Sequence, residues 1–244
     1  MSGSTASPSS ATASVPGDGQ EAVLDVRAQR TRTRLREAVL RLARERPVEE
    51  IAVADLVRDA RVNRTTFYNH VATPAAVLEQ VLYEELDQLR ADWIEDTLEA
   101  RRPADEVWKR ASEALIDHLE RYDAVYTTGL VGQRSPALHR LLVEHFTASV
   151  RALLDREPGM LPLGPAPRSD SPTPDSAPAS EEPGGPVAWR REAYSRFVAY
   201  GEVGIVEAWL ALPSPRDPHL FVSAAETMLP DWLSSTGAAG PADR

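Results

Sequence analysis

A short polar stretch near position 65 carries the side chains best suited to chemistry in this chain. Residues 63–71 read NRTTFYNHV, in which cationic, hydroxyl and amide groups surround a single phenylalanine. This mixture of hydrogen-bond donors is what contacts to phosphates and base edges require. The side chains that we expect to contact DNA are Arg64, Thr65, Thr66, Tyr68, Asn69 and His70, together with Arg32 from the preceding helix.

The residues around this stretch predict a helix-turn-helix over roughly residues 51–71. Residues 53–60 repeat apolar side chains at helical spacing, and residues 64–70 form a second short helix after a three-residue turn. Asn63 is a suitable N-cap, because its side-chain oxygen can accept from a backbone N–H two or three residues later. The side chains that we expect to pin the second helix against the first are Val62, Phe67 and Val71.

The stretch VADLVRDARVNRTTFYNHVATPAAVLEQVL resembles the signature of the TetR family of bacterial regulators. The resemblance is close over about residues 28–90 and extends beyond them only as a helical layout. It implies an N-terminal DNA-binding domain and a larger helical domain that binds an effector and forms a dimer. By position, it implies DNA-backbone contacts for Thr66 and Tyr68, and base- or groove-facing roles for Arg64, Thr65 and Asn69. The matching residues are Asp55, Ala60, Val62, Thr66, Phe67, Tyr68, Ala76, Val77 and Leu78.

Four positions depart from the usual pattern of that family. Ala52 replaces a capping Thr or Ser, Arg61 a turn glycine, His70 a tyrosine and Pro74 a lysine that reaches phosphate. If residue 61 needs a positive φ, a side chain there costs about 1 kcal/mol. The departures lower the expected number of phosphate contacts, which leaves open a TetR-like coregulator that acts through a protein partner. The side chains that could compensate by releasing counterions are Arg30, Arg32, Arg34 and Arg36.

The charge of the chain is unevenly distributed. The formal net charge is −10, yet residues 21–73 carry 11 arginines against 8 acidic residues, so the acidity lies after residue 73. The chain has no cysteine, which excludes disulfides and thiolate metal sites and favours a cytoplasmic location. We expect no metal, because the five histidines include no pair at ligand spacing. We also expect neither a signal peptide nor a membrane span, because no apolar run is long enough.

Helical periodicity dominates the chain and predicts an all-α fold. Residues 21–73 would form the helix-turn-helix domain and residues 74–236 the effector-binding and dimerisation domain. Residues rich in Pro, Ser, Gly and Ala predict an unstructured tail over 1–20 and a loop over 157–186. The helices expected in the second domain run from 74 to about 100, and over 103–121, 124–132, 136–156, 187–211 and 217–234.

Residues 187–234 suit a dimer interface, because their apolar stripe contains two glycines three residues apart. Each glycine costs a helix about 1 kcal/mol, for which the close approach of a second helix would compensate. The alternative is a core face within one chain. The expected interface residues are Phe197, Gly201, Gly204, Ile205, Ala208 and Trp209.

Aromatic and amphipathic side chains on the middle helices could line an effector pocket or form plain core. No nucleophile elbow, P-loop or dinucleotide motif occurs, so we expect neither an enzyme nor a cofactor. The leading hypothesis is a homodimeric repressor that binds a palindromic DNA operator and responds to a small molecule. A regulator without an effector, whose central helices are solid core, also remains open. The expected pocket residues are Trp108, His118, Tyr122, Tyr126 and Phe146.

Overall fold

A computed structural model of the chain describes residues 18–99, 104–132, 134–161 and 185–228. Within these ranges every regular element is helical, which confirms the predicted fold class. Three shorter elements join the helices: η1 (Val48–Glu50), the π-helical η2 (Thr127–Gly132) and η3 (Pro158–Met160). The helices are α1 (Asp18–Ala43), α2 (Val53–Ala60), α3 (Arg64–Tyr68), α4 (Pro74–Leu98), α5 (Ala104–Arg121), α6 (Asp123–Tyr126), α7 (Pro136–Arg156), α8 (Pro186–Leu210) and α9 (Pro218–Met228).

The predicted boundaries need three adjustments. The tail predicted for residues 1–20 is too long, because α1 begins at Asp18 and Gln20, Glu21 and Ala22 are good helix formers. The helix predicted over 124–132 is a short α-helix followed by a π-helical turn. The chain leaves α7 through the turn η3, whereas most of the predicted loop, residues 162–184, lies outside the described ranges.

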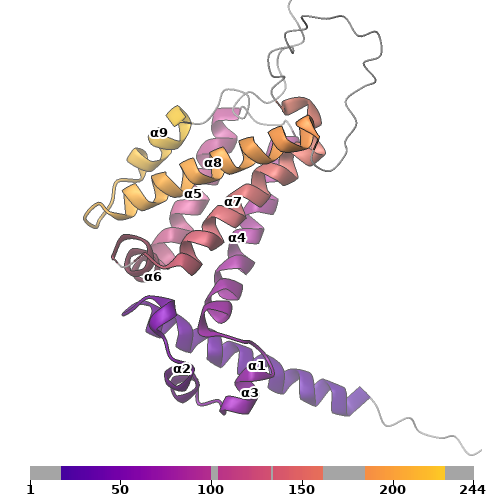
Figure 1. The fold of residues 1–244 in the computed structure, drawn as a ribbon, viewed down its shortest axis with the longest axis vertical. Helices are drawn as coiled ribbons and strands as arrows, with labels where there is room; N and C mark the ends of the chain where they lie inside the picture. The colour runs from indigo at the N-terminus through magenta and orange to yellow at the C-terminus, as the bar shows by residue number, and fades with distance from the viewer. Residues whose placement is uncertain (1–17, 100–103, 133, 162–184, 229–244) are drawn as a thin grey trace, which may run out of the picture.

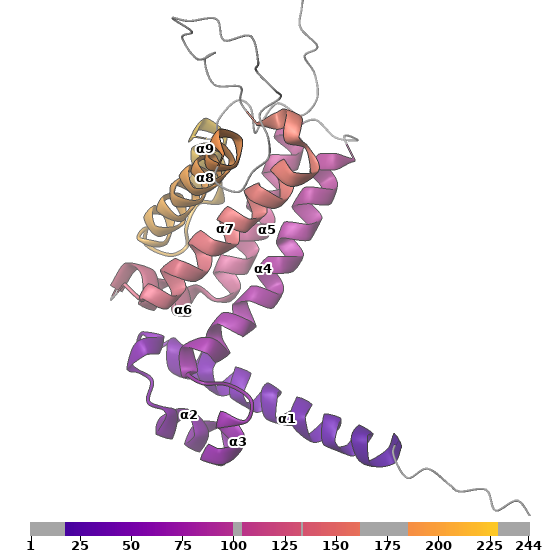
Figure 2. The same cartoon turned by 45° about the vertical axis from the view of Figure 1, so that its right-hand side comes forward.

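Two parts of the molecule are distinct in Figure 1: a three-helix unit of α1, α2 and α3, and a bundle of α4 to α9. The three-helix unit packs around side chains that α1 buries at helical spacing, namely Leu35, Ala38, Val39 and Ala43. Phe67 of α3 is fully buried against this core, and Val62 and Val71 pack partly buried beside it. The start of α1 projects away from the unit (Figure 2).

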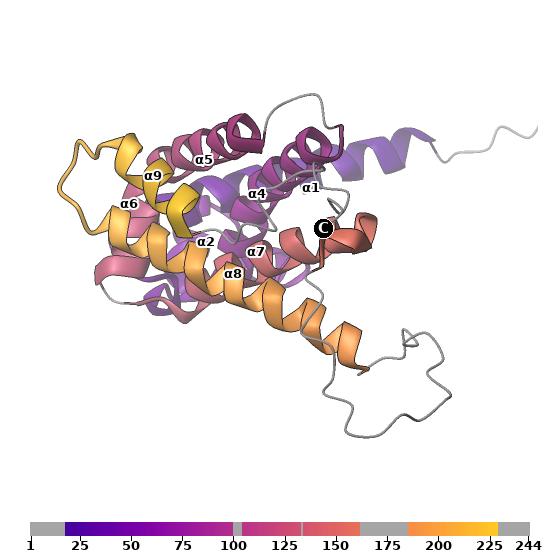
Figure 3. The ribbon, with the colours of Figure 1, turned by 90° about the horizontal axis from the view of Figure 1, so that it is seen from above.

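Helix α4 belongs to both parts, since it starts at the three-helix unit and runs along the bundle (Figure 2). Its first turn is fixed by Thr73, whose hydroxyl accepts from the N–H of Ala76 at 3.1 Å, with Pro74 at the first helical position. In the bundle α4 packs against α5 and α7, and α7 lies along α8. Helix α9 folds back onto α8 and α5 (Figure 3).

Candidate DNA-contacting helix and ligand cavity

Helix α3 is short and is held by its cap and by one apolar anchor. The Asn63 side chain accepts from the N–H of Thr66 at 2.7 Å, as predicted for the N-cap. Phe67 anchors the helix from below, and its ring lies edge-on to Tyr68 with centroids 5.3 Å apart. The opposite side of α3 is open to solvent. The exposed side chains there are Arg64, Thr65, Tyr68 and Asn69, while Thr66 and His70 are partly buried.

Arg64 and Tyr68 form a pair on this open side. The guanidinium lies 5.7 Å from the centre of the tyrosine ring, and its Nη2 donates to the tyrosine hydroxyl at 3.4 Å. Tyr68 remains 50% exposed, so both polar tips can reach an outside partner. The pair therefore presents a cation and a hydroxyl from one turn of α3.

Two of the departures from the family pattern lie at the two ends of α2. Arg61 has φ 53° and ψ 45°, the left-handed conformation, which costs a residue with a side chain about 1 kcal/mol more than glycine. Ala52 occupies the N-cap of α2 without any side-chain hydrogen bond. Both positions thus keep the backbone geometry of a helix-turn-helix without its usual side chains.

Several arginines of the three-helix unit form ion pairs, either within the unit or with α4. Arg36 pairs with Glu84 and Glu85, whereas Arg30, Arg32 and Arg34 on the same helix are exposed. Further pairs are Arg41 with Asp59, and Arg46 and Arg58 with Asp55. Arg36 is therefore committed to α4, and only three of the four arginines expected to compensate for lost phosphate contacts are open to solvent.

The Glu85 cluster, made of Arg36, Glu85, His118, Arg121, Tyr122 and Tyr126, joins the three-helix unit to the bundle. Glu85 on α4 accepts from the Tyr122 hydroxyl at 2.6 Å, from Arg121 Nη1 at 2.9 Å and from Arg36 Nη2 at 3.3 Å. Burial alone would raise the pKa of the Glu85 carboxyl, but the hydrogen bond from Tyr122 and the charge of Arg121 outweigh it and lower the pKa. Glu85 is thus an ionised carboxylate whose oxygens accept hydrogen bonds from neighbouring side chains.

Three residues predicted for the effector pocket lie in this cluster instead. His118, Tyr122 and Tyr126 are buried where α5 and α6 face α1 and α4. Their polar atoms have hydrogen-bond partners there, which makes their burial tolerable. His118 Nε2 and the Tyr126 hydroxyl are 2.8 Å apart, and His118 Nδ1 is 3.4 Å from Glu85. Burial lowers the pKa of His118, so its imidazole is neutral at neutral pH. None of these three side chains lines the cavity described below.

A second attachment of the three-helix unit involves Glu49 of η1. Its carboxylate accepts from the Ser135 hydroxyl and from the Ala137 N–H, both at 2.9 Å, at the start of α7. Nearby, the Thr128 hydroxyl donates to the carbonyl of Arg44 at 3.0 Å. The three-helix unit is therefore attached to α4, η2 and the start of α7.

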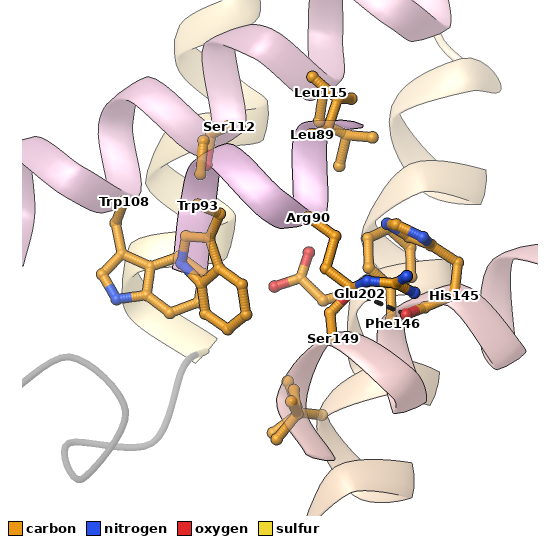
Figure 4. A pocket seen from close by; sticks show the side chains of 13 residues that line it. Leu89, Arg90, Trp93, Trp108, Ser112, Leu115, His145, Phe146, Ser149 and Glu202 are labelled. Carbon is orange, nitrogen blue, oxygen red and sulfur yellow. Dashed lines mark hydrogen bonds between the residues drawn. The ribbon is translucent and has the colours of Figure 1, made fainter. Parts of the chain in front are cut away.

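A cavity of about 80 Å³ lies among α4, α5, α7 and α8 (Figure 4). Two predicted pocket residues, Trp108 and Phe146, line it. Sequence reasoning missed Glu202, although it lies four residues after Val198 and three before Ile205, so that a charge interrupts a buried apolar stripe of α8. The other lining residues are Leu89, Arg90, Trp93, Ala111, Ser112, Leu115, His145, Ser149, Val150 and Val198.

The titratable groups of the cavity differ in their charge and in whether they have a hydrogen-bond or ion-pair partner. Burial raises the pKa of Glu202 to about 7, and among the described residues it has no hydrogen bond or ion pair. Arg90 is paired with Asp87 and lies 5.8 Å from the ring of Tyr83. Burial also lowers the pKa of His145 to about 3, so this imidazole stays neutral. At pH 8 the cavity thus holds one unpaired negative charge.

Helix α8 carries the predicted interface, of which four residues are exposed and two are not. Phe197 is 68% exposed, and a Cβ added at Gly201 or Gly204 would meet nothing within 4 Å. Ala208 is exposed on the same helix, but Ile205 and Trp209 are buried.

The burial of Trp209 has a local cause, because α9 folds back over it. Its ring meets Phe221 of α9 edge-on at 5.8 Å, and its Nε1 donates to the carbonyl of Asp217 at 3.1 Å. Trp209 is therefore core of a single chain, and the exposed face of α8 is narrower than predicted.

No helix in the described ranges is long and apolar enough to cross a membrane. The same residues contain no cluster of three or more side chains able to hold a metal ion.

No protein-family model matches this sequence, and no curated protein matches it. Among solved structures it is similar to FadR from Thermus thermophilus, a TetR family transcriptional repressor in complex with lauroyl-CoA, at 20% identity and a TM-score of 0.52. That match covers 87% of this chain and 100% of FadR. Weaker similarities are to RolR (16% identity, TM-score 0.45, 80% and 89% covered) and to a regulatory protein TetR from Rhodobacter sphaeroides (13%, 0.44, 80% and 95%). The likeness to FadR shows that this chain has the TetR-family fold.

Proposed function

We propose that this protein is a transcription regulator that binds double-stranded DNA as a homodimer and releases it when a small molecule occupies the cavity. The observation that carries the proposal is the open side of α3. There a capped and anchored helix presents Arg64, Thr65, Tyr68 and Asn69 to solvent within a TetR-like fold. A recognition helix held in this way can enter a major groove without unfolding.

The open side of α3 supplies both kinds of contact that DNA recognition needs. Arg64 offers a guanidinium fork suited to phosphate or to guanine, and Asn69 an amide suited to adenine. The Tyr68 hydroxyl adds a phosphate contact, as the family resemblance implies. The exposed Arg30, Arg32 and Arg34 of α1 add positive charge to the same three-helix unit. Affinity should therefore fall steeply with salt.

Homodimer formation is assigned to the open face of α8, with a second copy of the chain as the occupant. The exposed apolar side chains there are Trp189, Phe197 and Tyr200, and Met228 of α9 lies beside them in a groove that includes Gly201. The two glycines would let the partner's helix approach closely. A two-fold axis through this face would present two α3 helices to two half-sites of one operator.

The cavity and the three-helix unit share helix α4, which gives a route for the response. Leu89, Arg90 and Trp93 line the cavity, and Glu85 lies one turn before Leu89 on the same helix. A ligand that displaces α4 against α7 or α8 also displaces Glu85, which holds Arg36 of α1. The movement of Arg36 and α1 would change the tilt of α3. The spacing between the two recognition helices of the dimer would then change as well.

The test is DNA binding by the purified protein, measured by fluorescence anisotropy on DNA from upstream of its own gene. We expect salt-sensitive binding that a shuffled sequence of equal composition does not reproduce. Arg64→Ala should weaken binding by about 1–3 kcal/mol and Tyr68→Phe by about 1 kcal/mol, the latter on all sequences. Arg156→Ala, an exposed arginine at the end of α7, is the matched control and should change nothing.

Two outcomes would contradict the proposal. One is the absence of sequence-selective binding, and the other is unchanged affinity in Arg64→Ala. A protein that binds no DNA but forms a stable complex with another protein would match the coregulator alternative instead.

A further inference from the structure

We propose that the cavity binds a small amphipathic cation, with an apolar or aromatic body and one ammonium group that pairs with Glu202. This assignment names the class of the effector and so rests on the proposed function, although the binding itself requires no DNA. It is carried by the placement of Glu202, by the charges around it and by the composition of the walls.

Figure 4 shows the Glu202 carboxylate pointing into the cavity from α8, between the two tryptophans on one side and Arg90 and His145 on the other. Among the described residues it makes no hydrogen bond and no ion pair. Glu202 is partly buried, and a carboxylate that loses part of its hydration without gaining a partner is less favourable than one that meets a cation. A ligand with positive charge supplies the partner that the chain does not.

None of the other three helices around the cavity offers that charge. From α4, Arg90 lines the cavity and its charge acts on His145, but it is paired with Asp87 and not with Glu202. From α7, His145 is neutral because of its burial, and α5 contributes the uncharged hydroxyl of Ser112. Burial is thus the only cause of the raised pKa of Glu202, and no cation of the described chain pairs with its carboxylate, which favours a cationic ligand.

The walls suit an aromatic or aliphatic body. Trp93 and Trp108 lie with ring centroids 5.6 Å apart and tilted by 52°, and indole faces attract cations as well as apolar groups. Trp93 Nε1 and His145 Nδ1, on two of the lining residues, are buried without a hydrogen-bond partner. The space of about 80 Å³ is about half of the roughly 150 Å³ that a benzene-binding cavity provides, so the walls close around part of the ligand and the rest extends through the side that is open to solvent.

The experiment uses three matched probes and the full-length protein without DNA. Binding of 4-phenylbutylammonium, 4-phenylbutanol and 4-phenylbutanoate is followed at pH 8 by tryptophan fluorescence and by calorimetry. We expect the ammonium compound to bind at least tenfold more tightly than the alcohol, and the carboxylate most weakly. Because the pKa of Glu202 is about 7, affinity for the ammonium compound should fall about tenfold from pH 8 to pH 6.

Two variants separate the role of Glu202 from a general effect of charge. Glu202→Gln should remove the preference for the ammonium compound and leave alcohol binding unchanged. Glu207→Gln removes the same charge from the same helix outside the cavity and should keep the preference. We expect only Glu202→Gln to lose the preference for the ammonium compound. Unchanged binding of the alcohol would show that this variant is folded.

Three results overturn the assignment: equal binding of ammonium and alcohol, tighter binding of the carboxylate, or no binding of any probe. Each is independent of the proposed function, because a protein that binds its DNA selectively and fails this test is still a regulator. Conversely, ammonium binding in a protein without DNA affinity would uphold the cavity assignment alone.

Discussion

Glu85 and Glu202 are two carboxylates of the same bundle with opposite surroundings. Glu85 is met by Arg36, Arg121 and Tyr122, and the pKa of its carboxyl is lowered in spite of burial. Glu202 meets no partner among the described residues, and burial raises its pKa to about 7. The charge of Glu85 therefore holds neighbouring helices together, whereas the charge of Glu202 remains available to a ligand.

The largest effect on stability should come from removing the satisfied carboxylate. Glu85→Ala leaves Tyr122 and Arg36 without their shared acceptor, and we expect a loss of about 3 kcal/mol in the free energy of unfolding, measured with urea. Glu84→Ala is the matched control, because Glu84 is exposed and holds only Arg36, so it should cost less than about 1 kcal/mol. Equal losses of stability in the two variants would contradict the claim that Glu85 stabilises the fold through its partners.

The next effect has the opposite sign and depends on pH. Because the pKa of Glu202 is raised on folding, its contribution to stability is fully present below about pH 4.5 and is lost as pH rises through about 7. Glu202→Gln should therefore stabilise the protein at pH 8 by at most about 3 kcal/mol, less wherever water reaches the cavity. At pH 4.5 the variant and the wild type should unfold alike. A loss of stability at pH 8 would show that Glu202 has a partner after all.

A smaller loss should follow from Tyr126→Phe, which keeps the ring and removes one hydroxyl. His118 Nε2 then loses its contact at 2.8 Å in a buried site, at a cost of about 1 kcal/mol. Thermal unfolding by circular dichroism is sufficient to detect it. An unchanged midpoint would mean that water replaces the hydroxyl.

The smallest effect should come from Arg121→Ala. Its side chain is 63% exposed although it contacts Glu85 at 2.9 Å, so the pair should contribute about 0.5 kcal/mol. A double-mutant cycle with Tyr122→Phe would show whether Glu85 depends mainly on its more buried partner. A coupling energy between Arg121 and Tyr122 above about 1 kcal/mol would show that Arg121 contributes substantially to the stability of the cluster.

Local signals predicted the helix-turn-helix well, because caps and helical periods act over a few residues. Asn63 caps the helix that its side chain suggested, and Phe67 is the anchor of α3. The left-handed conformation at Arg61 followed only from the family resemblance, since nothing in the side chain indicates it.

The cavity was harder to predict, because periodicity shows that a helix face is buried but not which neighbour covers it. His118 and Phe146 both lie on buried or half-buried faces, yet only Phe146 reaches the cavity, since α5 turns His118 toward α1 and α4. Trp209 is covered because α9 folds back over α8, a tertiary event without a local signal. The aromatic residues Trp108 and Phe146 were predicted and line the cavity, whereas the charge at Glu202, set in an apolar stripe, was a further signal in the sequence.

The central claim is that occupancy of the Glu202 cavity controls DNA binding at α3. The direct measurement is the dissociation constant for DNA from upstream of the protein's own gene, at pH 8, with and without saturating 4-phenylbutylammonium. The account predicts at least fivefold weaker DNA binding with the cation in the wild type and in Glu207→Gln, and no change in Glu202→Gln. An unchanged DNA affinity in wild-type protein that calorimetry shows to be saturated with the cation would contradict it.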